Sequence, residues 1–321
     1  MLAIRIHETG GPERLTVEEV PVPEAGPGQV LIRVAATGVN FVEVYHRQGL
    51  YPRALPFIPG GELAGTIEKL GAGVQDLKVG DRVATASGTG GYAQFALAPA
   101  EQVVSVPASI SLETAAALIL QGLTAHYLAV STFALKAGDT ALVHAAAGGV
   151  GLLLTQIAKR KGARVLATVS TTEKADLARK AGADHVILYT QTDFAAEVEQ
   201  LTGKRAVDVV YDGVGQTTFA RGLGLLRPRG MMVLFGQSSG PVAAFDPLLL
   251  SRNGSLFVTR PTLGDYTQTR GELLSRTDDL FSWVADGLSV RIDRTFPLAQ
   301  ARAAHSCLES RASMGKILLL P

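Results

Sequence analysis

The sequence is poor in cysteine and in charge, and each shortage excludes a class of protein. Its 321 residues contain one cysteine, Cys307, so an intrachain disulfide and a four-cysteine zinc lobe are both impossible. Charged residues make up 18% of the chain and the formal net charge is +1, which argues against a nucleic acid or a membrane surface as the main partner. We find no apolar run as long as a membrane span, and the alternating residues 1–7 lack the layout of a signal peptide. These features predict a soluble protein of the reducing cytoplasm.

Hydrophobic residues, by contrast, are abundant at 47%, and the length is sufficient for two domains. The first ~120 residues have the punctuated, alternating pattern of β-structure. Strands are expected at residues 30–36, 62–70 and 82–85, separated by turns rich in glycine and proline. This part of the chain is therefore predicted to form a β-rich domain.

From residue 111 the apolar period becomes that of a helix, and strands and helices then alternate. Six strands joined by helical or irregular crossovers are what a complete doubly wound parallel sheet requires. We expect these strands at residues 141–144, 164–169, 185–188, 207–211, 231–235 and 255–259.

After residue 260 the alternation stops, and two helices at 270–286 and 298–309 and a strand at 315–320 are expected. This tail is too small to stand alone, so we expect it to complete the first domain. The result is a catalytic domain of residues 1–122 and 261–321 around a dinucleotide-binding domain of residues 123–260. Substrate would bind in the cleft between the two domains.

The segment from Thr140 to Lys159 is predicted to form a strand, a glycine turn and a helix that follow one another directly. This order brings free backbone N–H groups of a helix N-terminus to a place where an anionic pyrophosphate can bind. The match to the pattern G-x-G-x-x-G is imperfect, because Ala146 stands at the first glycine position, with Gly148 and Gly151 at the others. We expect Ala146 to keep a negative φ, Gly148 to let the cofactor approach and Gly151 to let the helix pack on the sheet.

The next strand ends at Ser170, 24 residues after Ala146, where a dinucleotide fold carries its ribose-contacting residue. NAD-type sites place an acid there, whereas this chain has small hydroxyls followed by Lys174. A 2′-phosphate is repelled by a carboxylate and bound by hydroxyls and an ammonium group, so the segment favours NADPH over NADH. The alternative is that Ser170 and Glu173 form only a capping box and that Lys174 is a solvated helix residue, and both interpretations can hold at once.

Several motifs in one order resemble those of the medium-chain dehydrogenase/reductases, specifically the zinc-free, zeta-crystallin-like NADPH:quinone oxidoreductases. The resemblance covers essentially the whole chain, and the segments Thr259-Arg260-Pro261 and Glu309-Ser-Arg311 are most similar to the bacterial members. It implies an α/β protein with a GroES-like catalytic domain and a Rossmann domain that binds NADPH. The motifs are Gly60-Gly61-Glu62-x-x-Gly65, Gly80-Asp81-Arg82-Val83, Gln121-Gly-Leu-Thr124-Ala, His144-Ala-Ala-Ala-Gly-Gly-Val-Gly151, Val209-Val-Tyr-Asp212-x-Val-Gly215 and Phe235-Gly236-x-Ser-Ser239-Gly240.

The resemblance also implies site residues in both domains. Asn40, Phe41 and Tyr45 would line the nicotinamide and quinone side, and Asn40 and Tyr45 are the candidates for catalysis. His46 stands beside Tyr45 without a role that the resemblance supplies. The remaining implied contacts are with the cofactor: Thr124, Thr259 and Arg260 near the nicotinamide, Ala147, Gly148, Gly149 and Val150 at the pyrophosphate, Ser170 and Lys174 at the 2′-phosphate, Tyr189 beside the adenine ribose, and Phe235, Gly236, Ser238 and Ser239 in the loop after the fifth strand.

Zinc-dependent members of the superfamily use a Cys in the region of Asn40 and a His in the region of Gly61, and neither residue found here can replace such a ligand. A site from His46, Glu43 and Glu62 is conceivable, but without helical spacing or another nearby histidine a core or surface role for His46 is the better interpretation. We therefore expect no metal.

Without a metal as Lewis acid, the acceptor must already be electron-poor and conjugated, such as a quinone or an enone. Tyr45 is the candidate to hydrogen-bond the reduced oxygen or to relay a proton, and a purely stacking role for Tyr45 is an equal alternative. Ser238 and Ser239 lie in a glycine loop without a partnered base, so no covalent intermediate is expected.

Two other functions stay open. The chain could reduce an enone, an enal or an enoyl thioester, although no basic strip for coenzyme A phosphates is visible in the sequence. It could also be a non-enzymatic protein that binds NADPH or RNA, but scattered charge and the absence of an aromatic–basic motif weigh against RNA. The resemblance implies a homodimer. The strand at 255–259 closes the sheet and could pair across a two-fold axis, which would also hide its open edge.

Overall fold

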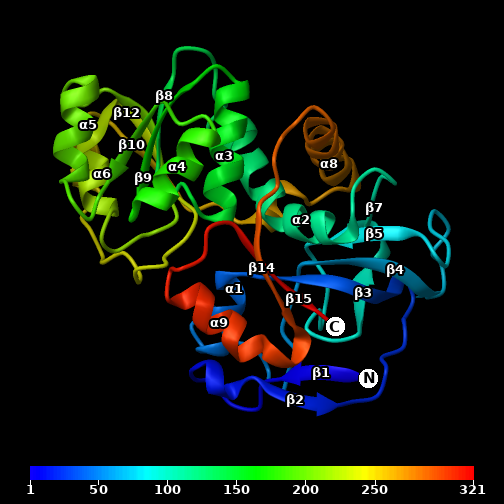
Figure 1. Ribbon diagram of the computed structural model, residues 1–321. Coiled ribbons are helices and arrows are strands. Elements are labelled where there is room, and N and C mark those ends of the chain that lie inside the picture. Colours follow the sequence, from blue (N-terminus) through cyan, green and yellow to red (C-terminus); the bar gives the residue numbers. More distant parts are fainter. The chain divides into compact units, whose positions relative to one another are not determined.

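The computed structural model describes all 321 residues, which form two compact units. The first unit consists of Met1–Gln121, Thr269–Ser282 and Val290–Pro321. The second consists of Gly122–Gln268 and Trp283–Ser289. Each unit has its own sheet (Figure 1) and its own cluster of buried apolar side chains.

The first unit is built on a seven-stranded sheet in the order β14-β15-β3-β4-β5-β7, with β6 paired to β3, and on a two-stranded ribbon of β1 and β2. Strand β15 at the C-terminus pairs antiparallel with β3, so the tail completes the N-terminal sheet as the sequence predicts. The bounds are β1 Leu2–Arg5, β2 Thr16–Glu19, β3 Gln29–Val39, β4 Leu63–Leu70, β5 Arg82–Thr85, β6 Phe95–Pro99, β7 Val104–Ser105, β14 Ile292–Pro297 and β15 Lys316–Leu320.

Helices of the first unit connect and cover these strands. The two expected C-terminal helices are present, the second beginning with a 3₁₀ turn, while the short helix directly after β3 was not expected. The helix that starts in this unit at residue 112 continues into the second unit. The bounds are α1 Phe41–Arg47, α2 Leu112–Tyr127, α8 Arg270–Ala285 and α9 Ala301–Glu309, with 3₁₀ turns at Pro12–Arg14, Ala100–Gln102 and Leu298–Gln300.

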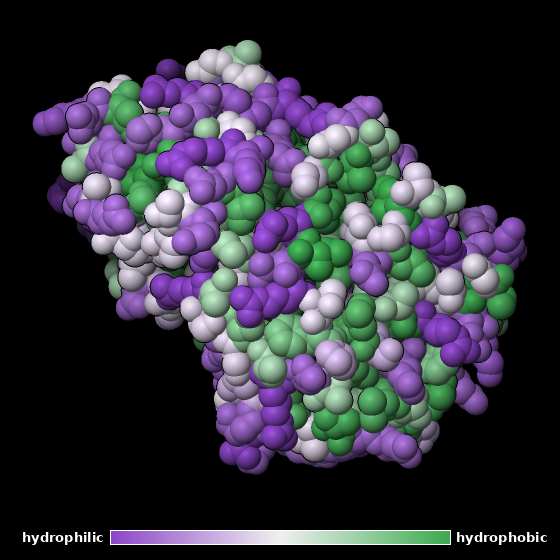
Figure 2. Space-filling view, in the orientation of Figure 1, coloured by the Kyte–Doolittle hydropathy of each residue, from purple (hydrophilic) through white to green (hydrophobic).

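The chain has no uninterrupted apolar run as long as a membrane span, yet one helix is long enough and apolar enough on average to cross a membrane. Residues Leu112–Thr132 meet that criterion by length and composition. However, 72% of the most apolar stretch of this helix is buried inside the fold, because its apolar side chains fill the core. On the face drawn in Figure 2, hydrophobic side chains are interspersed with hydrophilic ones. These features are typical of a core helix.

The second unit contains a six-stranded sheet in the order β10-β9-β8-β11-β12-β13, and every neighbouring pair is parallel. This is the doubly wound order, and all six predicted strands are present. The bounds are β8 Thr140–Val143, β9 Arg164–Val169, β10 His185–Leu188, β11 Val207–Asp212, β12 Leu226–Leu234 and β13 Phe257–Thr259, with helices α3 Gly149–Arg160, α4 Thr172–Lys180, α5 Phe194–Thr202, α6 Phe219–Leu225 and α7 Leu248–Arg252, a π-helical turn at Leu128–Thr132 and a 3₁₀ turn at Leu263–Tyr266.

Because all six strands are parallel, their carboxyl ends lie along one edge of the sheet. The strand order reverses between β8 and β11, since the chain passes outward from β8 to β10 and then returns to the other side. Doubly wound sheets bind ligands at the carboxyl edge beside this reversal.

Candidate functional site

The turn from β8 to α3 presents backbone N–H groups that no side chain caps. Gly148 is the N-cap of α3 in an extended conformation, and no side chain accepts a hydrogen bond from the first turn of the helix. The N–H groups of Gly149, Val150 and Gly151 belong to this turn, where a helix has no intrahelical acceptors for them. Together with the positive end of the helix dipole, they form a place for an anionic group.

The two glycines of this turn have the roles that the sequence predicts. A Cβ on Gly151 would lie 2.7 Å from the Cα of Ala146 and closer still to the carbonyl oxygen of Ala145, so only glycine allows this packing. A Cβ on Gly148 would meet only the Ala145 oxygen, at 3.2 Å, which leaves its outer side open. Ala146 keeps φ negative as expected, and the left-handed residue is instead Ala145, with φ of 52°. Strain of this kind in a non-glycine residue is typical of ligand-binding turns.

The other predicted cofactor residues of the second unit follow the carboxyl ends of further strands of the same sheet. They are therefore gathered along one edge, except Thr124, which is a buried residue within α2. Following β8 is Ala147, following β9 are Ser170 and Lys174, following β10 is Tyr189, following β12 are Phe235, Gly236, Ser238 and Ser239, and at and after the end of β13 are Thr259 and Arg260.

Ser170 directly follows β9, and no intramolecular hydrogen bond engages its hydroxyl. The capping box expected on Ser170 is wrong, because Thr171 is the N-cap of α4 and accepts a hydrogen bond from the backbone N of Lys174 at 3.3 Å. The carbonyl of Ser170 accepts from Thr190 Oγ1 at 2.9 Å, which fixes the backbone at the strand end. Lys174 lies in the first turn of α4, where the helix dipole disfavours a cation. A bound anion would relieve that penalty.

The loops after β11, β12 and β13 are tied to one another. Arg260 donates to the carbonyl oxygen of Gly236 at 3.2 Å and to Oε1 of Gln237 at 3.1 Å. Ser239 Oγ donates to the carbonyl oxygen of Val214 at 2.8 Å. The hydroxyl of Ser239 and the guanidinium of Arg260 therefore hold this edge of the sheet in shape, in addition to any contact with a ligand.

In the first unit, the predicted acceptor-side residues lie together on α1. Asn40 is the N-cap, and the Oε2 of Glu43 accepts a hydrogen bond from the backbone N of Asn40 at 3.0 Å, which starts the helix. Phe41 and Tyr45 are one turn apart, with ring centroids separated by 6.1 Å. The ring of Tyr51 packs edge-on against Tyr45 at 5.3 Å and extends the aromatic surface. Tyr51 was missed by sequence reasoning.

Asn40 is also the centre of a buried polar cluster that the sequence did not reveal. Its Nδ2 donates to Oε2 of Glu62 at 2.9 Å, and its Oδ1 accepts from Nζ of Lys316 at 2.6 Å. Lys316 and Glu62 form an ion pair, and both side chains are almost completely buried. The other oxygen of Glu62 accepts from the backbone N of Leu120 at 2.8 Å. No local signal could have identified Lys316, because it lies 276 residues from Asn40.

Glu43 belongs to the same interior and is strongly perturbed. Burial, against the lowering effect of Lys316 and with a smaller contribution from the neighbouring charge of Glu62, raises the pKa of Glu43 to about 7. The Oε1 of Glu43 accepts from the backbone N of Gly61 at 3.3 Å. Glu43 therefore joins the helix start to the Gly60-Gly61-Glu62 segment.

A second group of buried polar side chains surrounds His305. Arg47 contacts Nδ1 of His305 at 2.9 Å, and the hydroxyl of Tyr92 contacts Nε2 at 3.0 Å. Arg47 also pairs with Glu309 at 2.8 Å. Burial, with a further contribution from Arg47, lowers the pKa of His305 to about 3, so this histidine is a neutral core residue.

The residues present do not fit a catalytic zinc. Where zinc-dependent relatives carry thiolate and imidazole ligands, this chain has Asn40 and Gly61, and Glu62 is already engaged by the ammonium of Lys316. An ammonium group at a carboxylate opposes a second cation there. The alternative ligand set of His46, Glu43 and Glu62 is not assembled, since no group of three or more His, Cys, Asp or Glu side chains could hold a metal ion.

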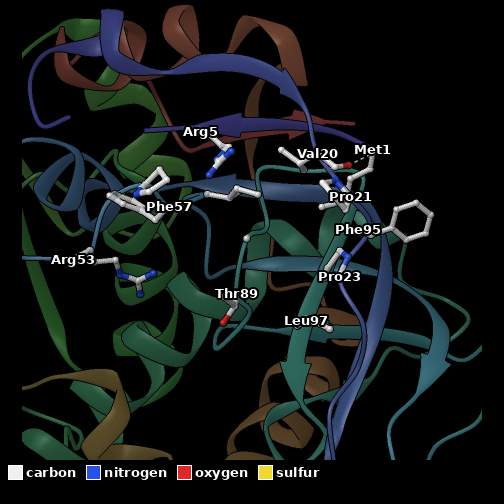
Figure 3. A pocket seen from close by; sticks show the side chains of 13 residues that line it. Met1, Arg5, Val20, Pro21, Pro23, Arg53, Phe57, Thr89, Phe95 and Leu97 are labelled. Carbon is white, nitrogen blue, oxygen red and sulfur yellow. Dashed lines mark hydrogen bonds between the residues drawn. The ribbon is translucent and has the colours of Figure 1, made fainter. Parts of the chain in front are cut away.

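A pocket of about 430 Å³ lies elsewhere in the first unit (Figure 3). Its walls are largely apolar, with the guanidinium groups of Arg5 and Arg53 among them. None of the predicted site residues lines it, and Arg5 is already paired with Glu18 at 3.4 Å. The pocket is therefore separate from the groups described above.

Comparisons with known proteins agree with these two units. Residues 26–108 match the alcohol dehydrogenase GroES-like domain, and residues 149–273 match the zinc-binding dehydrogenase family. Quinone oxidoreductase 1 of Escherichia coli (strain K12) is 43% identical over 324 residues, which cover 99% of each chain. The 2-haloacrylate reductase of a Burkholderia species is 43% identical over 332 residues, covering 100% of this chain and 99% of the relative. The solved structure of mycobacterial Rv1454c complexed with NADPH superposes with a TM-score of 0.97 at 47% identity, covering 100% of both chains.

Proposed function

Because the chain belongs to the quinone oxidoreductases of the medium-chain dehydrogenase/reductase superfamily, we propose that it catalyses the zinc-independent reduction of quinones by NADPH. The reaction consumes one NADPH and one proton per quinone and yields NADP⁺ and a hydroquinone. The observation that carries this proposal is the full-length similarity to quinone oxidoreductases, together with the 0.97 TM-score to a relative solved with NADPH.

The second unit has the groups that such a cofactor needs. The uncapped turn at Gly149 and Val150 would receive the pyrophosphate, and Ser170 and Lys174 would receive the 2′-phosphate. Tyr189, about two-fifths exposed beyond β10, would contact the adenine ribose. Thr124, Ala147, Gly148, Phe235, Gly236, Ser238, Ser239, Thr259 and Arg260 would complete the cofactor contacts. When bound, NADPH supplies the electrons, and the protein supplies orientation.

The acceptor side is formed by Asn40, Phe41 and Tyr45. Aromatic rings can hold a flat conjugated acceptor by stacking, and a dry surrounding strengthens polar contacts with the acceptor oxygen. Asn40 and Tyr45 both carry hydrogen-bond donors that suit such an oxygen. Because the residues that replace the zinc ligands cannot supply a Lewis acid, an electron-poor acceptor is required, and quinones meet that condition.

A second acceptor class is favoured by one specific observation. A relative of equal identity is a 2-haloacrylate reductase, so related chains also act on a conjugated acid. Reduction of an enone, an enal or a haloacrylate by this chain is therefore the main competitor of quinone reduction. A direct comparison of quinones, conjugated carbonyl compounds and enoyl thioesters, each with NADPH and with NADH, tests the proposal.

We further propose a cytoplasmic homodimer that binds neither nucleic acid nor a membrane. Strand β13 is the edge of the six-stranded sheet, and Phe257 on it is 57% exposed, which suits pairing of two such edges. The functional division would follow residues 1–122 and 261–321 on the acceptor side and 123–260 on the cofactor side. Sedimentation analysis tests the dimer. Retention of single-stranded RNA at physiological salt, with and without NADPH, tests the RNA-binding alternative.

A further inference from the structure

We propose that Lys316 is a positioning residue of the acceptor site: its ammonium group orients and polarises the side-chain amide of Asn40, so that the free N–H of Asn40 donates to the acceptor oxygen as negative charge develops there. This inference rests on the proposed function, because it assumes that the acceptor is a quinone bound beside Asn40.

The orientation of the amide follows from the chemistry of its two neighbours. An ammonium group can only donate hydrogen bonds, and a carboxylate can only accept them. Oδ1 of Asn40 must therefore face Lys316, at 2.6 Å, and Nδ2 must face Glu62, at 2.9 Å. The positive charge on one side of the amide and the negative charge on the other therefore allow only one of its two flip orientations.

The same contacts leave one donor of Asn40 available. Oε2 of Glu62 bonds to both Nδ2 of Asn40 and Nζ of Lys316, while Nζ also bonds to Oδ1 of Asn40, so the three groups close a ring. This ring uses the amide hydrogen on the same side as Oδ1. The second hydrogen has no partner in the structure, and Asn40 keeps 7% of its surface exposed.

Burial makes the effect of Lys316 on the amide strong. Lys316 is 1% exposed and Glu62 is 0% exposed, so little water screens the ammonium from the amide oxygen. A cation at the oxygen of an amide draws electron density away from the nitrogen, and hydrogen bonds in such chains reinforce one another. A buried ion pair contributes little net stability to a fold, whereas its effect on the orientation of Asn40 is direct.

Gly38 makes room for this arrangement. A Cβ at Gly38 would lie 2.7 Å from Cδ of Glu62 and 2.7 Å from Cε of Lys316. Any larger residue would displace one partner of the ion pair. The register that pairs Gly38 on β3 with Leu318 on β15 brings Lys316 to the end of β3, where Asn40 begins α1.

The chemistry balances without a change in Lys316 or Asn40. In total, the quinone would take two electrons and one hydrogen from the bound cofactor, and the oxygen that gains negative charge would take the second proton from water, which yields the hydroquinone and NADP⁺. Asn40 keeps both amide hydrogens, and Lys316 stays protonated. The contribution of the two residues is stabilisation of charge on the oxygen, which matters most for quinones that accept electrons poorly.

The test measures kcat/KM for a series of benzoquinones and naphthoquinones that span a wide range of reduction potentials. Lys316→Met removes the charge, Lys316→Arg keeps it, and Asn40→Ala removes the amide donor. The control is Lys69→Met, an exposed lysine on β4. We expect kcat/KM of Lys316→Met to fall about tenfold or more with the quinones of lowest reduction potential and much less with those of highest potential. The dependence of kcat/KM on the reduction potential of the quinone should therefore become steeper. Lys316→Arg should recover most of the loss, and NADPH affinity should stay unchanged.

A double-variant comparison separates positioning from folding. If Lys316 acts through Asn40, Lys316→Met should change the dependence on potential in the native background and not in Asn40→Ala. An Asn40→Ala enzyme with the native dependence on potential would overturn the proposal, even if Lys316→Met fails to fold. A folded Lys316→Met enzyme with the native dependence would also overturn it. If the unaltered protein reduces no quinone, the proposed function itself has failed.

Discussion

The ammonium nitrogen of Lys316 lies 2.6 Å from the side-chain oxygen of Asn40, although 276 residues separate them in the chain. The contact forms because the C-terminal strand pairs with β3, at the end of which Asn40 starts a helix. The last segment of the sequence therefore contributes a charge beside Asn40, a residue of the proposed acceptor site. A relative that binds a metal here would need metal-ligating side chains in place of Asn40 and Lys316.

Replacement of Lys174 should change the choice of cofactor. Lys174→Asp places a carboxylate where the 2′-phosphate of NADPH would bind, and we expect the ratio of kcat/KM for NADPH over NADH to fall about 10- to 100-fold. Steady-state kinetics with both cofactors measures the ratio. Lys180→Asp at the other end of the same helix is the control and should leave the ratio unchanged. An unaltered ratio in Lys174→Asp would remove the 2′-phosphate assignment.

The two glycines of the β8–α3 turn should respond differently to a methyl group. Gly151→Ala forces a Cβ to within 2.7 Å of the Cα of Ala146, so we expect a lower melting temperature or no folded protein. Gly148→Ala meets only the Ala145 oxygen at 3.2 Å, so it should fold and bind NADPH more weakly. Calorimetric melting and cofactor titration of both variants give the comparison. Equal NADPH affinity in Gly148→Ala and the unaltered protein would contradict a pyrophosphate at this turn.

Tyr45→Phe should keep most of its turnover with quinones. The ring of Tyr45 contacts those of Phe41 and Tyr51, an arrangement that phenylalanine preserves, and in the proposed site Asn40 supplies another donor for the acceptor oxygen. We expect kcat to change less than about threefold, and Tyr45→Ala to raise KM because the stacking surface is lost. A loss in kcat of about 100-fold or more in Tyr45→Phe would instead make its hydroxyl the proton donor.

Glu43 should make the stability of the protein depend on pH. Its pKa is raised from 4.5 to about 7 in the fold, so the native state holds a proton that the unfolded chain releases at lower pH. The contribution of Glu43 to the free energy of unfolding is fully present below pH 4.5 and is lost as the pH rises through 7. The total decrease in the free energy of unfolding is about 3 kcal/mol at most. Urea unfolding at a series of pH values should show this decline in the unaltered protein and not in Glu43→Gln. If the free energy of unfolding depended on pH in the same way in both proteins, the assignment of this dependence to Glu43 would be refuted.

The parts of this protein that the sequence predicts are those with local signals. Period and turn residues located all six strands of the second unit, and the glycine turn with Ser170 after the next strand indicated a dinucleotide with a 2′-phosphate. The Asn40–Glu62–Lys316 cluster was not predictable in this way, because three segments far apart in the chain form it. Neither the motif that contains Glu62 nor the terminal strand that contains Lys316 predicts an ion pair, and only the pairing of β15 with β3 shows that the two side chains are buried together.

A local signal also misplaced one helix cap. The capping box assigned to Ser170 was one residue early, because a hydroxyl at either Ser170 or Thr171 satisfies the same pattern and only the backbone shows which one caps the helix. The local sequence was insufficient here, and the backbone decided which residue caps the helix.

The proposed NADPH-dependent quinone reduction is tested by kcat/KM for a matched set of quinones, enones, 2-haloacrylates and enoyl thioesters, each with NADPH and with NADH. We expect quinones to be reduced fastest, and kcat/KM with NADPH to exceed that with NADH by about tenfold or more for every quinone. Faster reduction of a haloacrylate or an enone than of any quinone, or equal rates with the two cofactors, would contradict it.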